Sequence, residues 1–164
     1  MCNAMTSLKL LIACTIFLNI SVTSFAQTEK TIDSLQNLEQ ACLDKGQFML
    51  GCSEKFYFQM DSLLNLEYKK LHSKCDSIQK ENLKDEQLQW LSKRDNQFKK
   101  NQVQEDKDAK EGGYDGGEDE TMMLTDDNAK FVKERVLELI NSSPQNYSAD
   151  KYKRKSSNIH VTNK

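Results

Sequence analysis

The stretch DSLLNLEYKKL at residues 61–71, followed after a short gap by LQW within LKDEQLQWLSKRD at residues 83–95, decides the fold of this chain. In both stretches, residues that recur at spacings of three and four fall on one side of an α-helix. Each such side mixes apolar residues with Asp, Asn, Gln or Arg, which an ordinary amphipathic helix keeps off its apolar stripe. Because a polar group buried without a partner is costly, the sequence predicts two neighbouring helices that supply each other's partners.

The apolar periodicity extends outward from these stretches and predicts an all-α antiparallel bundle of three to four helices. No Gly or Pro lies between Ser53 and Gly112, and the usual length of helices favours a hairpin there, with a turn at Ser77–Asn82. An acidic, glycine-rich loop is expected at Glu105–Glu120, and a polar, disordered tail at residues 142–164. The helices themselves are expected at residues 28–43, 48–78, 82–105 and about 125–141.

A hairpin that turns near Gln79 places Tyr68 opposite Trp90 and brings Asp61 within reach of Arg94. We therefore expect a semi-buried Asp61–Arg94 ion pair. The first interpretation of this network is that it fixes the register of the two helices, and the alternative is a groove that binds a partner. The expected members are Asp61, Asn65, Tyr68, Gln87, Trp90, Arg94 and Asp95.

The first 26 residues have the pattern of a cleaved secretion signal. Lys9 precedes an apolar run, Leu10–Val22, and Ser24-Phe25-Ala26 has small residues at the two positions that a signal peptidase reads. The alternative is lipidation at Cys14, which would leave most of the apolar run downstream of the cleavage point. Both interpretations predict export, a folded helical domain at residues 27–141 and no transmembrane segment in the mature chain.

The charge of the mature chain argues against nucleic acid as the partner. Lys9 is the only charged residue before Gln27, so 22 basic and 25 acidic residues remain, a net charge of −3. The expected loop at residues 105–120 has a net charge of −6 and fits a basic protein partner. The residues expected to bind this partner are Tyr114, Asp115, Glu118, Asp119 and Glu120.

Three cysteines remain after residue 26: Cys42, Cys52 and Cys75. Cys52 and Cys75 fall on one predicted helix, about 35 Å apart, which is too far for a disulfide. Cys42 and Cys52 flank a predicted turn and can meet across it. The alternative is that all three are unpaired. Cys75 is left over in either case, and in an exported protein it can form an intermolecular disulfide.

Signals of enzymatic activity are weak. His72 and Cys75 share one side of a helix, but nothing in the sequence indicates the pocket or oxyanion site that a catalytic Cys–His pair needs. The acidic loop departs from the EF-hand spacing, because Lys110 and Glu111 occupy positions where a ligand and a glycine are required. We therefore predict no enzyme activity, no metal and no cofactor.

The quoted stretches resemble the lysozyme-inhibitor LprI N-terminal-like family, whose members are small secreted or lipid-anchored bacterial domains. Cys42-x9-Cys52 is similar to the opening cysteine pair of the family, and Arg135 is similar to the arginine of its closing Thr-x-x-Arg segment. The chain departs from the family at Phe98, where a cysteine is usual, and no cysteine follows Cys75. The resemblance implies a protein-binding module that inhibits lysozyme, with a structural protein of the cell envelope as the alternative.

Overall fold

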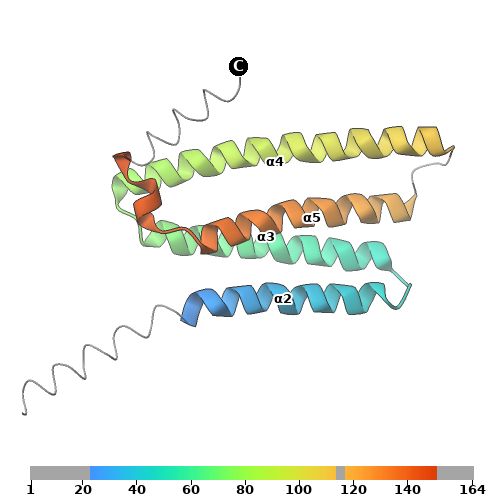
Figure 1. Cartoon of the computed structure of the whole chain (residues 1–164), viewed down its shortest axis with the longest axis horizontal. Coiled ribbons are helices and arrows are strands. Elements are labelled where there is room, and N and C mark those ends of the chain that lie inside the picture. The colour runs from blue at the N-terminus through green and yellow to red at the C-terminus, as the bar shows by residue number, and fades with distance from the viewer. Residues whose placement is uncertain (1–22, 114–116, 151–164) are drawn as a thin grey trace, which may run out of the picture.

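A computed structural model describes residues 23–113 and 117–150 of the chain. Within these ranges the chain forms four α-helices and a short 3-10 helix, without a β-strand (Figure 1). None of the helices in these ranges is long and apolar enough to cross a membrane. The prediction of an all-α antiparallel bundle is confirmed. The elements are α2 (Thr23–Leu43), α3 (Met49–Ser73), α4 (Ser77–Gly112), α5 (Glu118–Ile140) and η1 (Pro144–Tyr147).

The turn between α3 and α4 comes earlier than the sequence predicted. Asp76 caps α4: its side chain accepts a hydrogen bond from the backbone N–H of Gln79 at 2.9 Å. The Gln79 side chain accepts one from the backbone N–H of Asp76 at 3.0 Å, which completes a capping box. The predicted turn at Ser77–Asn82 is therefore wrong, because these residues form the first turns of α4.

The acidic loop is also shorter than predicted. α4 continues to Gly112 and is capped by Gly113, which has a φ of 71°. α5 already begins at Glu118. Glu118, Asp119 and Glu120 lie in the first turn of α5, where the helix dipole favours negative charge. Residues 105–112 are helical and carry i,i+4 contacts such as Gln104–Asp108 at 2.7 Å and Lys107–Glu111 at 3.7 Å.

The chain after α5 has defined structure as far as residue 150, although a disordered tail was expected at residues 142–164. It folds back as η1, where the Tyr147 ring is 2% exposed within the core. The Asn82 side chain donates a hydrogen bond to the Tyr147 carbonyl at 2.8 Å and so ties η1 to the start of α4. The prediction of disorder is wrong for residues 142–150, and residues 151–164 lie outside the described ranges, as does most of the predicted signal segment.

The closest helix packing is between α3 and α5, and not between α3 and α4 as predicted. Small side chains allow this approach: Ser53 is 1% exposed and Ala129 is fully buried. α4 packs mainly on α5 and η1, and α2 covers α3 and part of α5. In Figure 1, α4 and α2 accordingly lie at opposite edges of the bundle. The core includes Ile32, Phe56, Met60, Leu64, Leu83, Trp90, Val132, Val136, Leu139 and Ile140.

A disulfide joins Cys42 at the end of α2 to Cys52 in the first turns of α3, as the spacing of the two residues suggested. The intervening turn contains Gly46 with a φ of 63° and Phe48 with a φ of 54°. The link closes a short loop between α2 and α3, a type of restraint worth about 2–3 kcal/mol.

A half-buried carboxyl group lies where α2 meets α5. Glu39 Oε1 is inaccessible to solvent and has no hydrogen-bond partner among the described residues. Burial raises the pKa of Glu39 from 4.5 to about 7, and the Asp126 carboxylate adds to the rise. Lys130 and Lys133 act in the opposite direction but do not cancel it. The folded protein therefore holds a proton on Glu39 that the unfolded chain releases at lower pH.

This carboxyl should make stability depend on pH. The contribution of protonated Glu39 to the free energy of unfolding is complete below a pH of about 4.5. It is lost as the pH rises through about 7, because the ionised form is disfavoured only in the folded state. The free energy of unfolding of the unaltered protein should fall by about 1 kcal/mol between pH 5 and pH 8 because of this carboxyl. We expect Glu39→Gln to abolish this fall, as measured by urea unfolding. Glu54→Gln, at an exposed position of α3, is the control. Equal pH profiles for Glu39→Gln and the unaltered protein would contradict the assignment.

Candidate functional site

Arg135 is the most deeply buried charged side chain among the described residues, with 3% of its surface exposed. It lies on the inner face of α5, and its guanidinium reaches α4. Nε and Nη2 donate to Gln87 Oε1 at 3.2 and 3.0 Å, while Nη1 contacts Glu86 at 3.1 Å and Glu138 at 2.8 Å. These contacts satisfy the buried cation and fix the axial position of α5 against α4.

Trp90 forms the wall of this cluster. The Arg135 guanidinium carbon lies 5.8 Å from the centroid of its ring, and that of Arg94 lies at the same distance. The ring also stacks on Phe131 of α5, with centroids 5.9 Å apart and planes inclined by 21°. Trp90 is therefore enclosed by two cations and an aromatic ring, and only 8% of it is exposed. This arrangement of Arg135 and Trp90 holds α4 and α5 together, and solvent hardly reaches it. We call it the structural joint.

The predicted Asp61–Arg94 ion pair is not formed. Arg94 Nη2 pairs with the neighbouring Asp95 at 2.7 Å, and the Asp61 carboxylate accepts a hydrogen bond from Asn65 at 3.2 Å. Asp61, Arg94 and Asp95 all act on the Tyr57 hydroxyl, whose pKa is raised chiefly by burial, so they do lie at a similar height. The physical reason for the missing pair is α5, which keeps the backbones of α3 and α4 apart.

The other predicted network residues have different partners from those expected. Tyr68 stacks on His72 of its own helix, with centroids 5.8 Å apart, and does not face Trp90. Gln87 is a member of the network, as predicted, but it binds Arg135 and not Arg94. In the sequence, Arg135 lies three residues after Val132 and four before Leu139, so it falls on the apolar side of the last helix. A cation on an apolar stripe requires a buried partner, and that requirement was the signal that sequence reasoning missed.

The residues considered for catalysis do not form a reactive centre. Cys75 is 6% exposed, and burial raises the pKa of its thiol, with a further rise from Asp76. A buried thiol with a raised pKa is a poor nucleophile at neutral pH. In the part of the chain that the structure describes, no three His, Cys, Asp or Glu side chains are placed to hold a metal ion.

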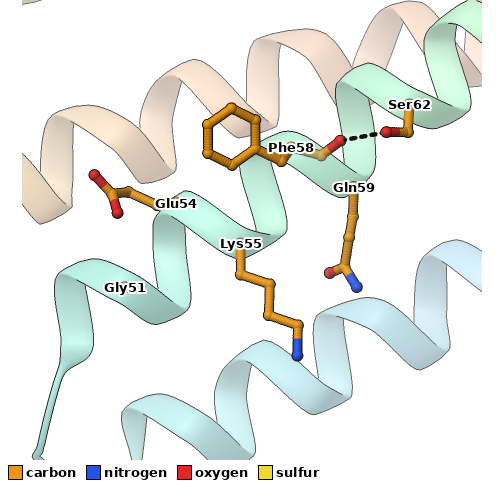
Figure 2. Close-up of a pocket in the computed structure, with 6 residues that line it drawn as sticks. All are labelled: Gly51, Glu54, Lys55, Phe58, Gln59 and Ser62. Carbon is orange, nitrogen blue, oxygen red and sulfur yellow. Dashed lines mark hydrogen bonds between the residues drawn. The ribbon is translucent and has the colours of Figure 1, made fainter.

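An open groove of about 430 Å³ runs along the outer face of α3 (Figure 2). Figure 2 shows Lys55 and Gln59 extending on the side of α2, away from Phe58. The Ser62 hydroxyl donates to the Phe58 carbonyl of its own helix at 2.8 Å. All six lining residues come from α3: Gly51, Glu54, Lys55, Phe58, Gln59 and Ser62. A shallow groove on a single helix, without converging polar groups, does not have the form of a catalytic site.

Another candidate surface is one end of the bundle, where the α2–α3 turn, the end of α4 and the start of α5 all lie (Figure 1). We call this surface the acidic end and define it by residues 105–112 and 117–120 together with the turn at residues 43–48. Glu118 and Asp119 are exposed there, and Glu120 accepts a hydrogen bond from the Gly117 N–H at 2.9 Å. Tyr114 and Asp115, which were predicted to bind a partner, lie outside the described residues.

The two arginines that contact Trp90 should differ sharply in their effect on stability. Arg135→Ala leaves buried polar groups without their cation, and we expect a loss of about 3–5 kcal/mol. Arg94→Ala removes a pair whose side chains are 24% and 67% exposed, and we expect a loss of about 1 kcal/mol or less. Urea unfolding of both variants measures the difference. Similar losses for the two variants would rule out Arg135 as the main buried joint.

Comparison with known proteins finds one family match. The family model described as lysozyme inhibitor LprI matches residues 39–139, which span the Cys42–Cys52 disulfide, all of α3 and α4, and α5 up to its last residue but one. No curated protein and no solved structure matches the chain. The matched segment covers more than half of the 164 residues and contains Gln87, Trp90 and Arg135. The chain belongs to the lysozyme inhibitor LprI family.

Proposed function

We propose that this protein is an exported helical module that binds and inhibits a lysozyme through its acidic end. The observation that carries the proposal is the family match over residues 39–139, since the family is described by lysozyme inhibition. The fold is compatible with a binding role, because the buried polar network holds the helices together. The proposed partner therefore meets the surface of the bundle and not its interior.

Electrostatics favour the acidic end as the contact surface. Lysozymes are commonly basic, and the segment 105–120 has a net charge of −6. Glu118 and Asp119 have no ion-pair partner within residues 23–113 and 117–150, so their charge is directed to solvent. Their position at the start of α5 also stabilises the helix through its dipole, and this role does not require a partner. The two roles are separable, because only binding depends on the charge of the second protein.

The export of the chain is part of the proposal. The predicted signal at residues 1–26, with lipidation at Cys14 as the alternative, would deliver the domain to the periplasm or outside the cell. The Cys42–Cys52 disulfide suits such an oxidising compartment. The alternative role as an envelope protein linked through Cys75 has less support, since that thiol is 6% exposed and an intermolecular disulfide would require the bundle to open.

Inhibition can be tested with the purified chain from Gln27 onward and a basic lysozyme acting on bacterial cell walls. We expect lysis to slow as the protein is added at low micromolar concentration and low salt. The effect should weaken as salt rises, because charges more than about 8 Å apart are largely screened at physiological ionic strength. Full lytic activity at a tenfold molar excess of the protein and low salt would exclude lysozyme inhibition.

A matched pair of double variants locates the contact. Glu118→Gln with Asp119→Asn removes two charges from the acidic end, while Glu29→Gln with Asp33→Asn removes two exposed charges from α2. We expect the first pair to lower the association rate at low salt by roughly tenfold, and the second to leave it nearly unchanged. Surface plasmon resonance at two salt concentrations measures both rates. Equal effects of the two double variants would show that net charge alone, and not the acidic end, guides binding.

A further inference from the structure

The turn between α2 and α3 holds an apolar side chain in an unusual position. Phe48 has a φ of 54° and a ψ of 35°, in the left-handed region that favours glycine. Its side chain is 85% exposed, the highest value among the exposed large hydrophobic side chains described. A bulky residue at positive φ is strained, and a phenyl ring that is mostly exposed does not offset this strain by burial. The stability of the fold therefore does not explain why a phenylalanine occupies this position.

The turn is nevertheless held by a covalent bond and by backbone hydrogen bonds. The Cys42–Cys52 disulfide closes it, with the two Cα atoms 5.9 Å apart. Inside this link, the backbone N–H of Lys45 donates to the Cys42 carbonyl at 3.2 Å, and that of Gly46 donates to the Leu43 carbonyl at 2.9 Å. The exposed ring of Phe48 is thus presented on a preorganised backbone, which reduces the entropy lost on binding.

Phe48 also lies at the acidic end of the bundle. Figure 1 places the α2–α3 turn at the same end as the start of α5, where Glu118 and Asp119 are exposed. Protein interfaces typically combine a central aromatic side chain with a charged or polar rim. In such an arrangement the charges govern mainly the association rate, and the buried aromatic governs mainly the dissociation rate.

We propose that the disulfide-closed turn at residues 43–48 enters the carbohydrate-binding cleft of the inhibited lysozyme, with Phe48 as the buried contact. This inference rests on the proposed function and names the residue that would carry it. A short turn presents a narrower surface to a concave cleft than the side of a helix does. The cleft of a glycoside hydrolase also contains two carboxyl groups. Lys45 is exposed and has no ion-pair partner in the described part of the chain, so its ammonium group can meet them.

Phe58 provides the internal comparison. It is also an exposed phenylalanine, at 65%, but it lies within α3, about 15 Å from Phe48 along the helix axis. Its ring already contacts Tyr57 edge-on, with centroids 5.9 Å apart, and its backbone is regular helix. A requirement for any exposed aromatic surface would involve both residues, whereas the turn proposal involves only Phe48.

The test compares Phe48→Ala and Phe48→Gly with Phe58→Ala in the chain from Gln27 onward. We expect both Phe48 variants to dissociate from lysozyme at least about tenfold faster and to inhibit correspondingly less, while Phe58→Ala stays within about twofold. Phe48→Gly should melt at the same temperature as the unaltered protein or higher, because glycine relieves the strained φ. Unchanged dissociation in the Phe48 variants, or a lower melting temperature in both, would overturn the proposal.

Competition with an N-acetylglucosamine trimer tests the cleft itself. We expect saturating trimer to lower the association of the unaltered protein with lysozyme, because both would occupy the same cleft. If the trimer has no effect while Phe48→Ala still weakens binding, the turn contacts another part of the enzyme and the cleft assignment is overturned. If the unaltered protein does not inhibit lysozyme at all, the proposed function fails together with this inference; inhibition that is independent of Phe48 removes this inference alone.

Discussion

The structure depends on the burial of one cation, the guanidinium of Arg135, between α5 and α4. A buried charge is tolerated only when hydrogen bonds and counter-charges replace water, and here Gln87, Glu86 and Glu138 provide them. Two of these three partners come from α4, so the cluster is satisfied only when α5 has the correct rotation and axial position. The buried polar contacts thus select one arrangement of helices that apolar packing alone would leave less defined.

An aromatic cluster extends this joint to α3. Phe98 of α4 contacts Tyr57 of α3 at 6.1 Å and Phe131 of α5 at 6.3 Å between ring centroids. Phe131 in turn stacks on Trp90, which lies against Arg135. Phe98 occupies the position where the family resemblance leads one to expect a cysteine. In this chain, ring packing at Phe98 connects α3, α4 and α5.

The helices and the first disulfide were predictable because their signals are local. Periodicity defined most of α3 and α5, and the spacing of Cys42 and Cys52 across a turn allowed their bond. The start of α4 was missed, although the Asp76–Gln79 capping box is visible in the sequence, because a weaker turn signal was preferred nearby. The Asp61–Arg94 pair failed for a non-local reason. Sequence periodicity shows which side of a helix is buried, but it does not show that α5, which begins more than 40 residues after the end of α3, would separate α3 from α4.

The same structure separates the residues that hold the bundle from those available to a partner. Arg135 and Trp90 are almost fully buried, so a partner cannot reach them without unfolding the joint. The exposed charges at the start of α5 and the strained Phe48 contribute little to the core, and they lie together at one end. A substitution in the joint should therefore weaken binding only by reducing the folded population. A substitution at the acidic end should change binding rates with only a small change in the folded population. Measured together, unfolding free energy and dissociation rate distinguish these two kinds of residue, which a binding assay alone would not.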